Sequence, residues 1–244
     1  MDKKAYLTID DGPSAYTGKL LDILKKEKIP AIFFVVGKNI LKLPNSKSIL
    51  LRILSEGHII GLHSMTHNKE ILYYSLNSAE SFLHEMNELN KLLKNVVGYE
   101  SSILRAPHGS FYNFRLGHYT KLKKSRFQYI DWNLDSRDWF FESVDDIQQQ
   151  IQSELQRIGN PAELVILFHE LPQTVKGLRQ FIDYFKSQGY NFVQYSENEK
   201  LVVKQVKSRN EKIHYLKLII RWHISDKVKL FKMNVGGLVS WLRK

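Results

Sequence analysis

Residues 5–14 read Ala-Tyr-Leu-Thr-Ile-Asp-Asp-Gly-Pro-Ser, an apolar run that ends in two adjacent carboxylates and a turn. This order predicts a strand that delivers acidic side chains to its carboxyl end. Neighbouring residues at a strand end point in different directions, so Asp10 and Asp11 can serve one site in different roles, one as a metal ligand and the other as a proton acceptor. Asp-Gly-Pro is also common turn sequence, so the stretch alone leaves a simple turn open.

A second strand-like run, residues 58–62, leads into His63-Ser64-Met65-Thr66-His67. Two histidines four residues apart on a helical turn face the same way, so we expect both to reach one cation. In a chain with nine histidines such a pair is a weak motif by itself. Its value is as a complement to an acid, because two imidazoles and one carboxylate form a three-ligand metal site with positions left for water and substrate.

Three more strand-like runs end in polar residues. Each ending has a structural explanation of its own, such as a surface ion pair, a turn, a core tryptophan or a buried histidine. Together with the first two segments they place titratable groups after five strand-like runs, which indicates one shared site. The residues that follow the three runs are Arg105, Ala106, Pro107, His108 and Gly109; Trp132, Asp135, Asp138 and Trp139; and His169 and Glu170.

In order and content, these five segments resemble the motifs of the polysaccharide deacetylase family, the NodB-homology or carbohydrate esterase 4 group. The resemblance covers residues 4–195. Ile9 stands where the first motif usually has phenylalanine, and His108 stands where an aromatic residue is more typical of the third. The five motifs correspond to residues 8–12, 63–67, 105–109, 135–139 and 167–169.

The resemblance implies a metal-dependent de-N-acetylase that hydrolyses the acetamide of N-acetylated amino sugars in a glycan, such as peptidoglycan or a chitin-like envelope polymer. One divalent ion is implied, with zinc expected and cobalt, nickel or manganese as alternatives. Its ligands would be Asp11, His63 and His67. Asp10 would be the base that activates water, and His169 the acid that protonates the departing amine.

The remaining implied roles are supporting ones. Arg105 would position or electrostatically tune Asp10, and Asp138 would hold His169. The backbone N–H of His108 would contribute to the oxyanion site, so replacement of the usual aromatic side chain should spare catalysis. The substrate pocket would be lined by Pro107, His108, Trp139 and Leu167.

The fold follows from the alternation of strand-like runs with helical patterns, which predicts a parallel sheet. Functional groups at the end of strand after strand favour a barrel over an open sheet, and the resemblance implies a distorted (β/α)7 TIM-like barrel. The runs span residues 4–10, 31–37, 58–63, 102–106, 127–133, 164–169 and 190–195. Helical spacing is clearest in Ile147, Ile151 and Leu155 after Ser143, in Phe82, Met86 and Leu89, and in Leu178, Phe181 and Phe185 before Gly189.

Charge divides the chain into a nearly neutral part, residues 1–200, and a basic one, residues 201–244. The whole chain carries +11, and residues 201–244 contain eight lysines and three arginines against one glutamate and one aspartate, a net charge of +9. We expect residues 1–200 to be the deacetylase domain and residues 201–244 a basic amphipathic extension. Its interleaved tryptophans suit an anionic membrane or wall-polymer surface. The alternative is that it packs on the barrel. Nothing forms a nucleic-acid-binding motif.

The compartment is left open by the sequence. There are no cysteines, so disulfides and thiolate ligands are excluded. No signal peptide or membrane-spanning run is visible, which predicts a cytoplasmic or inner-membrane-surface location, or the cell envelope if an N-terminal segment is removed.

Two rival functions are an O-acetyl esterase on the same barrel and a catalytically silent glycan-binding or surface module. The presence of every expected catalytic and metal-binding residue favours an enzyme. A phosphatase of the haloacid dehalogenase type fails on spacing, because that chemistry uses Asp-x-Asp.

Overall fold

Strand β1 (Lys3–Gly12) is the centre of the fold, which the computed structural model describes for residues 2–196 and 201. Along its length β1 pairs with β7 (Glu163–His169), and its carboxyl half pairs with β2 (Ala31–Val35). Its first residues pair with β8 (Tyr190–Phe192). β1 therefore carries its acidic end between the ends of β2 and β7.

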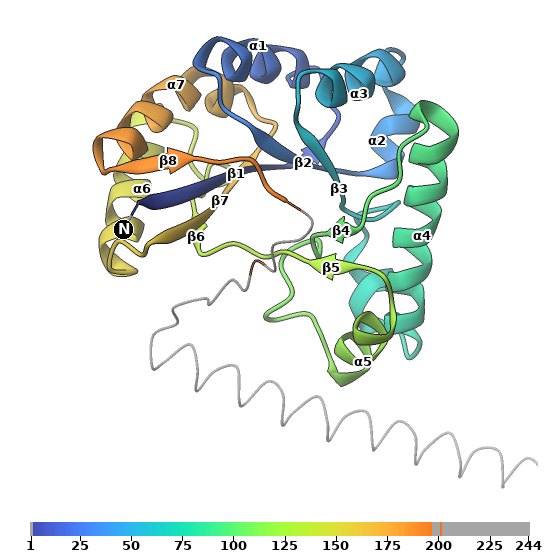
Figure 1. Ribbon diagram of the computed structural model, residues 1–244. Coiled ribbons are helices and arrows are strands. Elements are labelled where there is room, and N and C mark those ends of the chain that lie inside the picture. Colours follow the sequence, from blue (N-terminus) through green and yellow to red (C-terminus); the bar gives the residue numbers. More distant parts are fainter. Residues whose placement is uncertain (1, 197–200, 202–244) are drawn as a thin grey trace, which may run out of the picture. The chain divides into compact units, whose positions relative to one another are not determined.

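The other strands extend this sheet on both sides, and every pairing is parallel (Figure 1). They are β3 (Ile59–Leu62), β4 (Ile103–Leu104), β5 (Gln128–Tyr129) and β6 (Leu134–Asp135). The order is β5-β4-β3-β2-β1-β7-β6, with β8 on β1. The curved parallel sheet confirms the predicted distorted barrel, which stays open between β5 and β6 in the part of the chain described.

The predicted strand at residues 127–133 was too long, because only β5 lies within it and the next strand, β6, begins after it at Leu134. The residues between these strands have other hydrogen-bonding partners. The carbonyl oxygens of Ile130 and Asp131 accept hydrogen bonds from the Arg105 guanidinium, at 2.9 and 3.2 Å. These two carbonyl oxygens are thus bound by the buried arginine instead of by a neighbouring strand.

Helices lie around the outside of the curved sheet (Figure 1). The predicted helices around residues 82–96, 147–158 and 178–185 are present as α4 (Ser78–Val97), α6 (Val144–Arg157) and α7 (Pro172–Ser187). The hydroxyl of Ser143 caps α6 by accepting from the backbone N–H of Asp146, as the sequence predicted. The helices are α1 (Thr17–Glu27), α2 (Gly37–Lys42), α3 (Ser46–Ser55), the π-helix η1 (Glu70–Tyr74), α4 (Ser78–Val97), α5 (Leu116–Lys124), α6 (Val144–Arg157) and α7 (Pro172–Ser187).

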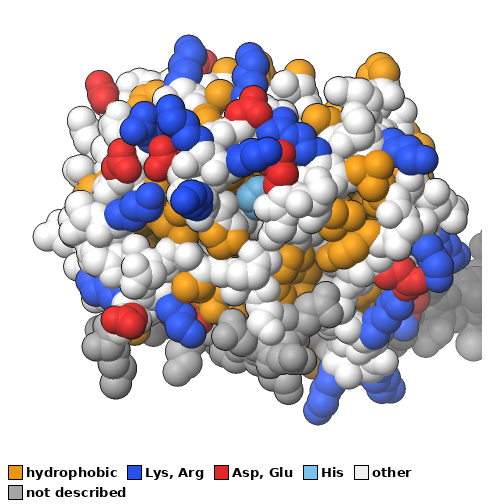
Figure 2. Space-filling model, turned by 45° about the horizontal axis from the view of Figure 1, so that its top comes forward, with side chains coloured by type: hydrophobic (Ala, Val, Ile, Leu, Met, Phe, Trp, Pro, Cys, Tyr) orange, Lys and Arg blue, Asp and Glu red, His pale blue; other side chains and the backbone are white. Residues whose placement is uncertain are grey.

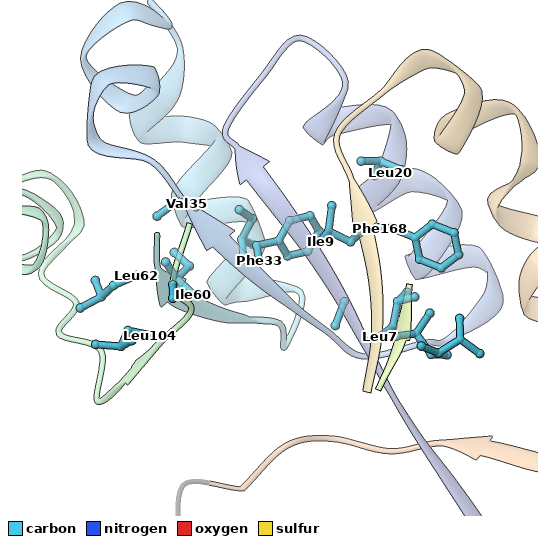
Figure 3. Packing of buried hydrophobic residues seen from close by; sticks show 14 of the residues in the cluster. Leu7, Ile9, Leu20, Phe33, Val35, Ile60, Leu62, Leu104 and Phe168 are labelled. Atoms are coloured by element: carbon cyan, nitrogen blue, oxygen red, sulfur yellow. The ribbon is translucent and has the colours of Figure 1, made fainter. Parts of the chain in front are cut away.

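Alternation along the strands gives the sheet two buried faces. Leu7 and Ile9 of β1 pack with Phe33 and with the helices in the larger cluster (Figure 3). Tyr6 of β1 instead joins a smaller cluster inside the barrel with Phe34. Because side chains alternate with a period of two, Thr8 and Asp10 belong to the same inward row as Tyr6. Burial of each large apolar side chain contributes about 1.5–3 kcal/mol, which fixes this register and hence the direction of Asp10.

The predicted extension lies almost wholly outside the described residues, so its surface-binding role stays a prediction. Leu201, its first residue, is buried in the inner cluster. Among the residues described, none of the helices combines the length and the apolar character needed to cross a membrane. On the face shown in Figure 2, basic side chains (blue) are interspersed with acidic ones (red), and hydrophobic side chains (orange) form patches between them.

Candidate active site

The acids at the end of β1 have different environments. Asp10 is paired in register with Phe34 of β2 and His169 of β7 and is only 2% exposed. Asp11 is half-buried and has a positive φ of 69°, which turns its side chain away from the regular strand direction. The amide of Asn39 donates to the carbonyl oxygen of Asp11 at 2.7 Å. The chain therefore separates the two carboxylates by direction and by burial.

Asp11 lies beside the two histidines of the second motif. Its Oδ1 is 3.5 Å from Nε2 of His63 and 3.2 Å from Nε2 of His67, and the three potential ligand atoms all lie within 4.8 Å of one another. The predicted helical turn was wrong, because residues 63–67 form an irregular loop with positive φ at Ser64 and His67. The loop, rather than helical spacing, turns both rings to one point, and the hydroxyl of Ser64 accepts from the backbone N–H of His67 to hold it.

These three side chains fit a divalent metal ion. Oδ1 of Asp11 is buried and has no hydrogen-bond partner, which is costly unless a cation satisfies it. Nδ1 of His63 lies 2.9 Å from the carbonyl oxygen of Arg105, so its proton is on Nδ1 and the Nε2 lone pair faces Asp11. Burial lowers the pKa of His63 to about 3, which keeps the ring neutral and able to coordinate.

Arg105 makes the closest charged contact to Asp10. Its Nη1 donates to Asp10 Oδ1 at 2.9 Å and to Thr8 Oγ1 at 2.6 Å, and its guanidinium carbon lies 4.3 Å from the centre of the Phe34 ring. Arg105 is fully buried. Burial raises the pKa of Asp10 and the charge of Arg105 opposes that rise. Asp10 is thus a desolvated carboxylate held by a fixed cation, an arrangement suited to accepting a proton.

His169 forms a second charged pair on the other side of Asp10. Oδ1 of Asp138 is 2.7 Å from the ring Nδ1, and Oδ2 accepts from the His169 backbone N–H at 2.6 Å and from Thr174 Oγ1 at 2.6 Å. Burial lowers the pKa of His169, but the hydrogen bond and charge of Asp138 outweigh it and raise the pKa to about 9. The ring is therefore protonated at neutral pH, with Nε2–H unused by Asp138.

The predicted pocket residues occupy the surroundings in different ways. His108 packs its ring edge-on against His67, with centroids 4.5 Å apart, and burial lowers its pKa to about 4. The carbonyl oxygen of Pro107 accepts from the Tyr73 hydroxyl at 2.8 Å, which fixes this turn. Leu167 is 3% exposed within β7, whereas Trp139 is 58% exposed beside Asp138. Leu167 and Trp139 are thus buried to very different extents.

Sequence reasoning missed three residues that shape the site. Thr8 bridges Arg105 to β7, because its hydroxyl donates to the carbonyl oxygen of Ile166 while accepting from the guanidinium. Asn39 holds the Asp11 peptide, and nothing in its local sequence indicated this. The sequence showed Glu170 beside His169 but gave it no role. Its position directly after an apolar strand was the available signal, because a carboxylate that is buried there needs a partner.

Comparisons with known proteins agree with this geometry. A family model described as polysaccharide deacetylase matches residues 1–125. A peptidoglycan-N-acetylglucosamine deacetylase of Bacillus cereus is 37% identical over 205 residues, which cover 82% of this chain and 72% of that protein. Bacillus subtilis YheN is 37% identical over 194 residues, so the match spans 78% of this chain and 66% of the length of YheN.

Solved structures give the same result for the fold. The crystal structure of the polysaccharide deacetylase Bc1974 from Bacillus cereus has a TM-score of 0.73 at 34% identity, over 83% of this chain and 96% of that one. A Streptococcus mutans carbohydrate esterase 4 enzyme has a TM-score of 0.72 at 29% identity, over 79% and 85% of the two chains. With the matched family model, these similarities establish that the chain belongs to the polysaccharide deacetylase family.

Proposed function

We propose that this chain is a metal-dependent deacetylase that removes the N-acetyl group from amino sugars of a glycan, with N-acetylglucosamine of peptidoglycan as the substrate class. The observation that carries the proposal is the convergence of Asp11, His63 and His67 on one point, beside Asp10, together with two charged pairs at the same end of the sheet. These pairs are Asp10 with Arg105 and His169 with Asp138.

Asp11, His63 and His67 would hold the metal, and zinc is the proposed ion because two imidazoles and one carboxylate form a typical catalytic zinc set. When bound, a divalent ion lowers the pKa of water and polarises an amide carbonyl. A carboxylate that coordinates a cation has little basicity left, so Asp11 and Asp10 divide the two tasks.

Asp10 is proposed as the general base. Its Oδ2 lies 3.6 Å from Nε2 of His63, so the carboxylate adjoins the metal site while Oδ1 is held by Arg105. Burial raises the pKa of Asp10 and so makes the carboxylate more basic, while the charge of Arg105 opposes this rise and favours the ionised form that accepts a proton from water. The water oxygen then forms a bond to the acetyl carbonyl carbon.

His169 is proposed as the general acid. The bond between the carbonyl carbon and the sugar nitrogen breaks as His169 gives its proton to that nitrogen, which yields acetate and a free amine. Asp138 stabilises the charged imidazolium and fixes the ring through Nδ1, so the other ring nitrogen presents the proton. Positioned acid catalysis of this kind contributes about 10²–10⁴ in rate.

The relatives support the substrate class. The Bacillus cereus relative is a peptidoglycan-N-acetylglucosamine deacetylase. The Streptococcus mutans neighbour is described as an esterase, so an O-acetyl esterase is the second candidate, because the same residues can activate water against an ester.

Acetate release tests the proposal. Zinc-loaded protein would be incubated separately with peptidoglycan, N-acetylated chitooligosaccharides and acetylxylan, and both acetate and free amine would be measured. We expect acetate and amine in equal amounts from an N-acetylated substrate. Acetate from acetylxylan alone would identify an esterase, and no release from any substrate by the metal-loaded chain would contradict both candidates.

A further inference from the structure

Glu170 is a buried carboxylate that the proposed chemistry does not use. It directly follows His169 at the end of β7, and its side chain contacts the loop between β1 and α1, which begins after Gly12. The residue is 5% exposed. A buried carboxylate needs partners, so its contacts indicate what it does.

The contacts of Glu170 converge on the loop after Asp11. Oε2 accepts hydrogen bonds from the hydroxyls of Ser14, at 2.6 Å, and Thr17. The two hydroxyls also bind the loop itself, because Ser14 Oγ accepts from the N–H of Tyr16 and Thr17 Oγ1 accepts from the N–H of Ser14. One carboxylate oxygen therefore ties together the turn that starts α1.

The second oxygen of Glu170 occupies the space next to Gly12. A Cβ at Gly12 would lie 2.2 Å from Oε1, so the motif glycine is required for the carboxylate to approach the backbone. The backbone N–H of Glu170 also donates to the carbonyl oxygen of Asp10, at 3.3 Å. Glu170 thus contacts the chain immediately before and immediately after Asp11.

Asp11 needs such support because its backbone has a positive φ, a conformation that L-residues rarely adopt and that persists where surrounding contacts determine it. Asn39 of α2 donates to the Asp11 carbonyl oxygen, and Glu170, directly after β7, accepts from the hydroxyl of Ser14 in the turn that follows β1. We propose that Glu170 is a positioning residue that fixes Asp11 in the direction needed to bind the metal. The inference rests on the proposed metal site.

Metal affinity without any glycan tests this role. Apo protein would be titrated with zinc in competition with a chromogenic chelator, and the cobalt-loaded form would be recorded by visible absorption. Glu170→Ala should weaken zinc binding about 10–100-fold and alter the cobalt spectrum, as loss of a group that orients a ligand does. Glu170→Gln keeps the shape and a carbonyl acceptor for the two hydroxyls, so it should restore affinity to within about 3-fold of wild type. Glu163→Ala, at the exposed start of the same strand, is the matched control and should bind as wild type.

Unchanged zinc affinity and cobalt spectrum in a folded Glu170→Ala variant would overturn the inference and leave the proposed function intact. Absence of zinc binding by the wild-type chain would contradict the proposed function itself. If Glu170→Ala does not fold, Thr17→Val decides, because it keeps the shape of Thr17 and removes the hydroxyl that donates to Glu170 and accepts from the N–H of Ser14. It should weaken zinc binding about 3-fold or more, and wild-type affinity in that variant would overturn the inference.

Discussion

The main-chain carbonyl oxygen of Arg105 lies 2.9 Å from Nδ1 of His63, while the side chain of the same arginine donates to Asp10. One buried residue therefore orients a proposed metal ligand through its backbone carbonyl and stabilises the ionised form of the proposed base through its side chain. Substitution of Arg105 removes only the second contact, which makes the two roles separable by mutation.

Arg105→Met should destabilise the fold by about 3–5 kcal/mol, because it leaves the buried carboxylate of Asp10 without its cation. Urea denaturation at neutral pH measures the change in the free energy of unfolding. The matched control is Arg126→Met, which removes an exposed ion pair with Glu100 and should cost less than about 1 kcal/mol. Equal losses in the two variants would contradict a buried, uncompensated charge at Asp10.

His63→Ala should weaken zinc binding by more than about 100-fold and abolish activity at limiting zinc, since it removes one of three ligands. Zinc content after dialysis and the dissociation constant measure the effect. His84→Ala is the control, because His84 is exposed on α4. Full activity of the wild-type chain after exhaustive chelation would rule out the metal mechanism.

Asp10→Asn and Asp11→Asn should have opposite signatures. Asp10→Asn should keep zinc bound and lose most turnover, because the amide cannot accept the proton from water. Asp11→Asn should lose zinc affinity, because a neutral amide replaces the negatively charged carboxylate whose Oδ1 has no hydrogen-bond partner. Zinc analysis beside kcat separates the roles, and the reverse pattern would exchange them.

His169→Ala should lower kcat about 10²–10⁴-fold with little change in KM, as loss of a proton donor does. In the wild-type chain the acid works while protonated, so kcat should fall as pH rises through about 9, the pKa that Asp138 sets. Asp138→Asn removes the charge that raises this pKa, so the fall should move to lower pH. A high-pH limb that stays in place in Asp138→Asn would show that another group titrates there.

The same pKa shift predicts a dependence of stability on pH. The folded-state pKa of His169, about 9, is above its ordinary value of 6.5, so its contribution to folding is complete below pH 6.5 and is lost as pH rises through about 9. Urea denaturation of wild type and His169→Ala across this range measures it. The difference in unfolding free energy between the two proteins should shrink towards pH 9 and above, and a constant difference would contradict the assignment.

Local patterns were sufficient for much of the fold. The apolar run from Ala5 to Ile9 predicts β1, because a strand pattern can be read from neighbouring residues alone. Ser143 predicts the start of α6 for the same reason, since a cap contacts only the first turn of its own helix. The early end of β5 could not be predicted from local sequence, because the carbonyl oxygens that follow it, of Ile130 and Asp131, bind Arg105, which lies more than twenty residues earlier.

The sequence by itself indicated the family, the parallel barrel and the candidate metal-binding and catalytic residues, because the order of the motifs and their positions at strand ends can be read without knowing any contact. Only the tertiary structure decided how those residues work together. It decided that His63 and His67 converge from an irregular loop and that Asp10 is bound by Arg105 through Oδ1 while Oδ2 lies 3.6 Å from His63. It also decided that Glu170 accepts hydrogen bonds from the turn after β1. These relationships join segments far apart in the chain, and they arise because burial in one core forces each polar group to find a partner where packing brings one within reach.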